Sequence, residues 1–72
     1  MLELIVKYNC TVKDDIRKYP DYSAAESFIE QKCERLADFG WHIKEVSGSN
    51  SKQGKIDCRI SNELIQIEWS TK

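Results

Sequence analysis

The chain has 72 residues and a formal net charge of −1 at pH 7. A chain of this length forms one domain, spanning residues 1–72, and is too small to enclose a large cofactor pocket. The balanced charge argues against a general nucleic-acid coat protein, which would be strongly basic. Leucine, isoleucine, valine and phenylalanine make up 17 of the 72 residues, above the roughly 20 % below which chains tend to be disordered, so the chain is expected to fold.

The first predicted element is a strand over residues 2–8, because apolar residues recur at every second position. Its inward positions are Leu2, Leu4, Val6 and Tyr8. Residues 12–19 are interpreted as an edge strand or a loop, since their lysines and aspartates are poorly suited to a central strand. Val12 and Ile16 are expected to point inward. Pro20 ends this segment because proline lacks the amide proton that a ladder needs.

A helix is predicted to follow, with Asp21 as its N-cap. At about 100° per residue its apolar residues share one side. These residues are Tyr22, Ala25, Phe28, Ile29, Cys33, Leu36 and Phe39. Gly40 ends the helix, because glycine adopts the left-handed conformation of a helix C-terminus at little cost.

After Gly40 the apolar period becomes two, which predicts further strands. Trp41 and Ile43 point inward, residues 47–54 form a flexible polar loop, and residues 61–63 turn the chain. The remaining inward positions are Ile56, Cys58, Ile60, Ile65, Ile67 and Trp69. The sequence therefore predicts an α+β domain in which one amphipathic helix packs on a four- or five-stranded, mainly antiparallel sheet, in the order β-(β)-α-β-β-β. Both tryptophans are expected in its core.

The sequence contains no catalytic or cofactor-binding motif, and the glycine-rich phosphate loop is also missing. His42 is the only histidine, and it falls on the outward side of its strand, which favours an ordinary solvated residue. The cysteines Cys10, Cys33 and Cys58 could join it at a zinc site. However, their spacings of 23 and 25 residues differ from the close pairs typical of zinc ligands. We therefore expect no catalytic residue, no metal and no cofactor.

The compartment is inferred from what the N-terminal segment lacks. Its longest apolar run is Leu4 to Val6, whereas a signal peptide needs roughly 7–15 apolar residues and a membrane-spanning helix about 20. The odd number of cysteines excludes a complete set of internal disulfides. We expect a cytoplasmic protein that does not associate with a membrane.

Four acidic residues recur at every fourth position of the predicted helix, and we call them the acidic ridge: Glu26, Glu30, Glu34 and Asp38. Each step advances about 6 Å along the helix and drifts about 40° around it. Like charges at this spacing destabilise a helix by roughly 0.2–0.5 kcal/mol per pair. Lys32 and Arg35 lie on the far flank. One interpretation is an ordinary solvated face; the other is a docking surface for a larger basic protein or a nucleoprotein complex.

An open sheet face is the alternative binding surface. Its expected outward positions are Glu3, Ile5, Lys7, His42, Lys44, Asp57, Arg59, Gln66 and Glu68. A weak RNA- or DNA-binding domain would use the cations Lys7, Lys44, Lys55 and Arg59. Domains that bind single-stranded nucleic acids stack the bases on aromatic side chains of the sheet. These outward positions hold no aromatic residue except the histidine. Direct nucleic-acid binding is therefore the less favoured prediction.

In size and composition the chain is similar to many small phage or mobile-element proteins, including some anti-CRISPR inhibitors. The resemblance carries no residue-level correspondence. It implies a short cytosolic α+β protein without a catalytic set. The function predicted from the sequence is a non-enzymatic protein-interaction module, in its sharpest form an inhibitor that blocks a basic nucleic-acid-handling partner through the acidic ridge. A homodimer is left open.

Overall fold

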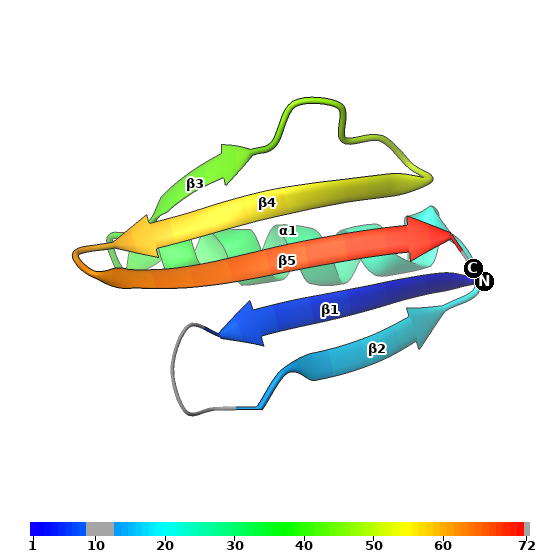
Figure 1. The fold of residues 1–72 in the computed structure, drawn as a ribbon, viewed down its shortest axis with the longest axis horizontal. Helices are drawn as coiled ribbons and strands as arrows, with labels where there is room; N and C mark the ends of the chain where they lie inside the picture. Colours follow the sequence, from blue (N-terminus) through cyan, green and yellow to red (C-terminus); the bar gives the residue numbers. More distant parts are fainter. Residues whose placement is uncertain (9–12, 72) are drawn as a thin grey trace.

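The structure is a computed structural model that describes residues 1–8 and 13–71. One helix packs on a five-stranded antiparallel sheet, which confirms the predicted α+β class (Figure 1). The elements are β1 (Leu2–Tyr8), β2 (Asp15–Tyr19), α1 (Tyr22–Asp38), β3 (His42–Glu45), β4 (Gln53–Ile60) and β5 (Glu63–Thr71). The strand order across the sheet is β2-β1-β5-β4-β3, so β2 and β3 are the two edges. Val12 lies outside the described residues.

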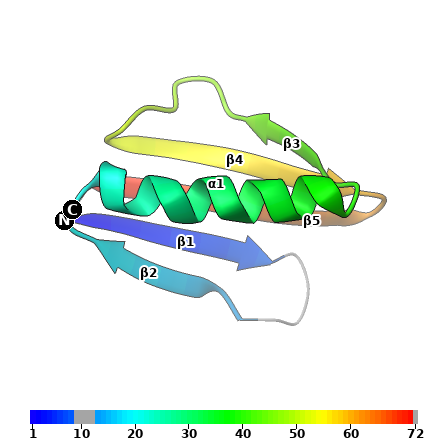
Figure 2. The same ribbon diagram turned by 180° about the vertical axis from the view of Figure 1, so that it is seen from behind.

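The core lies between α1 and one face of the sheet. The buried residues are Leu2, Leu4, Val6, Ala25, Ile29, Ile56, Cys58, Ile67 and Trp69. The β1–β5 and β4–β5 registers, which pair Leu4 with Trp69 and Ile56 with Ile67, bring the inward residues of three strands onto one face. The helix covers one side of the sheet: it lies behind the sheet in Figure 1 and in front of it in Figure 2. The other side is an open face.

The helix begins and ends where the sequence predicts. The Asp21 carboxylate accepts a hydrogen bond from the Ala24 N–H at 3.0 Å, which caps the first turn. Gly40 has a φ of 91°, the left-handed conformation expected just past a helix end. The prediction for Phe39 is wrong: its side chain is 77 % exposed, because this residue forms the C-cap and lies beyond the last turn that packs on the sheet.

The edge strand β2 corrects a second prediction. Ile16 pairs with Ile5 in the β1–β2 register, and residues directly opposite each other project from the same side of a sheet. Ile16 therefore points to the open face and is 59 % exposed. Arg17 and Tyr19 project toward the helix, since they pair with the buried Leu4 and Leu2.

The junction between the loop after β3 and the strand β4 corrects a third prediction. The polar loop ends at Lys52, and Gln53 and Gly54 belong to β4. Gly54 pairs with Trp69, and a Cβ atom at Gly54 would lie 2.2 Å from the indole ring. The Trp69 Nε1–H donates to the carbonyl oxygen of Asn50 at 2.8 Å, which fixes the loop to the core. The other tryptophan, Trp41, is only half-buried against the core rather than part of it.

Candidate functional site

The acidic ridge is uncovered. All four of its residues are exposed, and no ion pair within the described residues involves any of them. No lysine or arginine from a described loop or strand forms an ion pair with the ridge. The ridge starts at Glu26 beside the apolar side of α1 and drifts to Asp38, which points away from the sheet.

The ridge begins on the flank of the helix that faces β3, and we call this the β3 flank. The pKa of Tyr22, in the first turn of α1, depends on the negative charge of this flank. Burial raises the pKa of Tyr22, and the negative charges of Glu26, Glu45 and Glu30 raise it further. Glu45 is the last residue of β3, on the helix side, opposite the buried Ile56. Strand and helix thus contribute carboxylates to one acidic surface.

The opposite flank, toward β2, is basic and closed by its own contacts; we call it the β2 flank. The Arg17 guanidinium lies 4.2 Å from the centroid of the Phe28 ring and pairs with the Asp15 carboxylate at 3.1 Å. The Lys32 ammonium donates a hydrogen bond to the Tyr8 hydroxyl at 3.1 Å. Figure 2 shows β2 and β3 at the two margins of the helix. The two flanks therefore differ in charge and in the number of partners that their charges find.

The open face carries the alternative site. The strand registers place Lys7, Lys44, Lys55 and Arg59 together on it, as predicted. Acids are interleaved with these cations: Glu68 pairs with Lys7 at 3.1 Å and with Lys55 at 3.5 Å. Asp57 accepts a hydrogen bond from Gln66 at 3.1 Å. The described residues of this face include no tyrosine, tryptophan or phenylalanine, so the exposed His42 is the one aromatic ring they offer for stacking bases.

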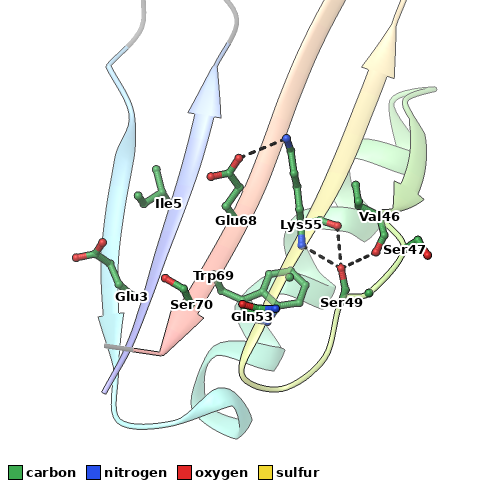
Figure 3. A pocket seen from close by; sticks show the side chains of 12 residues that line it. Glu3, Ile5, Val46, Ser47, Ser49, Gln53, Lys55, Glu68, Trp69 and Ser70 are labelled. Carbon is green, nitrogen blue, oxygen red and sulfur yellow. Dashed lines mark hydrogen bonds and ion pairs between the residues drawn. The ribbon is translucent and has the colours of Figure 1, made fainter.

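A depression on the open face lies between β1, β5, β4 and the loop after β3 (Figure 3). Several of its polar groups already have partners within the protein. Glu68 holds Lys55, and the Ser49 hydroxyl donates to the Val46 carbonyl at 2.7 Å and accepts from the Lys55 N–H at 3.1 Å. The arrangement stabilises the loop and offers neither a nucleophile with an adjacent base nor a cluster of ligands.

The thiols of Cys33 on α1 and Cys58 on β4 lie next to each other between the helix and the sheet. Cys58 is buried and Cys33 is half-buried, and both are free. A hydrogen bond between their thiols lowers the pKa of Cys33 and, together with burial, raises the pKa of Cys58. Within the described residues no three histidine, cysteine, aspartate or glutamate side chains gather as metal ligands. Cys10 lies outside that part of the chain.

The one described helix, α1, lacks the length and apolar character that crossing a bilayer requires.

Sequence reasoning missed the contribution of β3 to the acidic surface. A usable signal was present, because Glu45 follows Trp41 and Ile43 in the inward phase of the strand and is charged. An acid in that phase indicates a strand whose inner side is not sealed by the helix. Ile43, two residues earlier, is accordingly 36 % exposed.

Comparisons with protein-family models, with curated proteins and with solved structures found no match.

Proposed function

We propose that the protein is a non-enzymatic interaction module that binds a basic partner through its acidic ridge. The observation that carries the proposal is that Glu26, Glu30, Glu34 and Asp38 are exposed and form no ion pair within the described residues. Four carboxylates in a row repel one another along the helix. A basic partner relieves that repulsion and gains long-range electrostatic attraction.

The spacing of the ridge indicates the class of partner. Carboxylates that advance about 6 Å per step along a helix resemble the spacing of successive phosphates on a nucleic-acid strand. A groove that binds such a strand is lined with lysine and arginine, and the same cations bind carboxylates. The proposed partner is therefore a larger basic, nucleic-acid-handling protein or nucleoprotein complex, whose groove the module blocks. The finer form, an inhibitor of the phage or anti-CRISPR kind, is supported by the chain's size and composition alone.

A binding experiment with charge-reversal variants tests the proposal. The probe is a labelled, unstructured peptide of alternating lysine and serine, and binding is followed by fluorescence anisotropy. Glu30→Lys with Glu34→Lys should weaken binding at least about tenfold, because opposed like charges across an interface cost several kcal/mol. The matched control is Lys7→Glu with Lys18→Glu, which lie on the open face away from β3 and should not weaken binding. Equal binding by the ridge variant and the wild type would contradict the proposal.

The second candidate, a weak RNA- or DNA-binding domain, is supported by one observation: its four cations share the open face. A labelled single-stranded oligonucleotide distinguishes the two candidates. Nucleic-acid binding depends steeply on salt, because each phosphate contact releases counterions. If Lys7→Glu with Lys44→Glu abolishes a salt-dependent oligonucleotide complex while the ridge variant retains it, the open face is the binding surface.

A further inference from the structure

The free edge of β3 and the acidic flank beside it form one surface. We infer that this surface takes an extended, basic segment of the partner as an added strand of the sheet. The inference rests on the proposed function and specifies how the partner is held. In β-strand addition the main-chain hydrogen bonds provide affinity, and alternate side chains provide specificity.

The backbone of β3 offers the required groups. The Val46 N–H donates to the Lys55 carbonyl at 2.8 Å, so Val46 faces β4 in a hydrogen-bonded pair. Hydrogen-bonded and non-hydrogen-bonded pairs alternate along an antiparallel ladder. His42 and Lys44 therefore also bond to β4, whereas the N–H and C=O groups of Ile43 and Glu45 point to the outer edge. No described strand lies beside that edge.

The side chains beside this edge select what an added strand carries. On the helix side it would lie against Ile43 and Glu45, with Glu26 and Glu30 on the adjoining flank of α1. That side favours an apolar residue and lysine or arginine at alternate positions. On the open-face side the neighbours are His42 and Lys44, which favour hydroxyl or acidic residues. An added strand that fits this edge therefore carries basic and apolar residues in turn on its helix-side face, and hydroxyl or acidic residues on its other face.

The same charges disfavour the other occupants. A second copy that paired its own β3 here would bring two acidic flanks together, and like charges directly opposite in a sheet are destabilising. A nucleic acid has no backbone N–H and C=O groups to pair with the edge, and its negative phosphates are repelled by the carboxylates of the flank. The other edge, β2, presents Arg17 and Lys18, whose positive charges disfavour a basic segment.

Hydrogen exchange tests the inference with a designed probe. The probe is the acetylated and amidated peptide Thr-Lys-Thr-Val-Thr-Lys-Thr, which reads the same in both directions and places lysine, valine and lysine on one face. Binding should slow amide exchange at Ile43 and Glu45, whose N–H groups are free, and change little at His42 and Lys44, whose N–H groups already bond to β4. The control Thr-Thr-Lys-Lys-Val-Thr-Thr has the same charge without the alternation and should give no such protection.

A proline variant tests the same edge. Ile43→Pro removes an N–H that points outward, and proline is tolerated on an edge strand in that position. It should weaken binding of the alternating peptide roughly 2–10-fold, the loss expected for one hydrogen bond, relative to Ile43→Ala, which keeps the N–H. Circular dichroism checks that both variants fold; if Ile43→Pro does not fold, exchange at Ile43 and Glu45 in the wild type decides.

The outcomes separate the inference from the proposed function. If the alternating peptide binds, loses affinity on Glu30→Lys, and protects neither Ile43 nor Glu45, the strand-addition inference is overturned and the ridge proposal stands. If lysine peptides of either pattern bind equally in Ile43→Pro and Ile43→Ala, the inference is also overturned. If no lysine peptide binds, both fail.

Discussion

The two flanks of the helix are built from similar elements and differ in how their charges are satisfied. On the β2 flank Arg17 stacks on Phe28 and pairs with Asp15, and Lys32 bonds to Tyr8. On the β3 flank the carboxylates of Glu26, Glu30 and Glu45 have no such partners among the described residues. One flank therefore closes the edge of the core, and the other leaves its charges available.

This difference explains why net charge is a poor guide to the chemistry of this molecule. The chain is nearly neutral, yet its charges are segregated. Four acids lie in a row on the helix, with Glu45 of β3 beside them. The open face instead carries five cations against three acids: Lys7, Lys18, Lys44, Lys55 and Arg59 against Glu3, Asp57 and Glu68. A protein with two faces of opposite sign presents a different surface to a basic partner than to a nucleic acid.

The largest expected effect lies in the packing that holds the β3 side of the sheet together. Trp69→Ala should destabilise the domain by about 3–5 kcal/mol, typical of a buried aromatic, because the indole ring packs on Gly54 and bonds to Asn50. Since small domains have little stability to lose, this variant can be unfolded at room temperature. Urea denaturation followed by circular dichroism measures the loss. A midpoint equal to that of the wild type would contradict the observed packing.

Gly54 provides a double-mutant control for that contact. Gly54→Ala places a methyl group into the space of the Trp69 ring, and overpacking of this kind costs typically about 1–3 kcal/mol. In a Trp69→Leu background, which removes the indole ring but keeps an apolar side chain, the same substitution should cost little, because the ring is no longer there. Additive effects of the two substitutions would show that the ring does not lie over Gly54.

A smaller effect is expected on the β2 flank, where it distinguishes a closing contact from a binding surface. Arg17→Ala should destabilise the domain by about 0.5–1 kcal/mol, the strength of an exposed cation–π contact. It should leave binding of the lysine–serine peptide unchanged, since this flank carries no unpaired acid of the ridge. Thermal denaturation and anisotropy on the same sample measure both. The control Arg17→Lys keeps the charge but loses the planar stacking, so its stability should lie between those of the wild type and Arg17→Ala. A large loss of peptide binding in Arg17→Ala would indicate that the peptide binds the β2 flank, which would contradict the proposed binding at the ridge.

Most of the fold could be predicted from the sequence because its signals are local. The Asp21 cap, the Gly40 stop and the alternating residues of β1, β4 and β5 each depend on a few neighbouring positions. The errors involve information that is not local. Ile16 is one apolar residue in a five-residue strand, so its direction is set by the register with β1 rather than by its own pattern. Phe39 keeps the helical phase but lies beyond the end of the packed face.

The candidate site was predictable in part for the same reason. The period of four that defines the acidic ridge, and the placement of Lys32 and Arg35 on the other flank, follow from helix geometry. Which strand lies beside the ridge follows from the order β2-β1-β5-β4-β3. Sequence does not give that order, because several antiparallel arrangements bury the same inward residues. The contribution of Glu45 and the free edge of β3 therefore became visible only with the topology.

The smallest expected effect has the opposite sign and falls on the ridge itself. Glu30→Gln removes like-charge repulsion with both Glu26 and Glu34, each worth roughly 0.2–0.5 kcal/mol in an exposed helix. The variant should be slightly more stable than the wild type at low salt, and the gain should shrink as salt screens the charges. Because the Glu30 charge helps to raise the pKa of Tyr22, the same substitution should lower that pKa in an alkaline titration followed by NMR. A less stable Glu30→Gln protein with an unchanged Tyr22 titration would mean that Glu30 has a favourable partner and that the β3 flank is closed like the β2 flank.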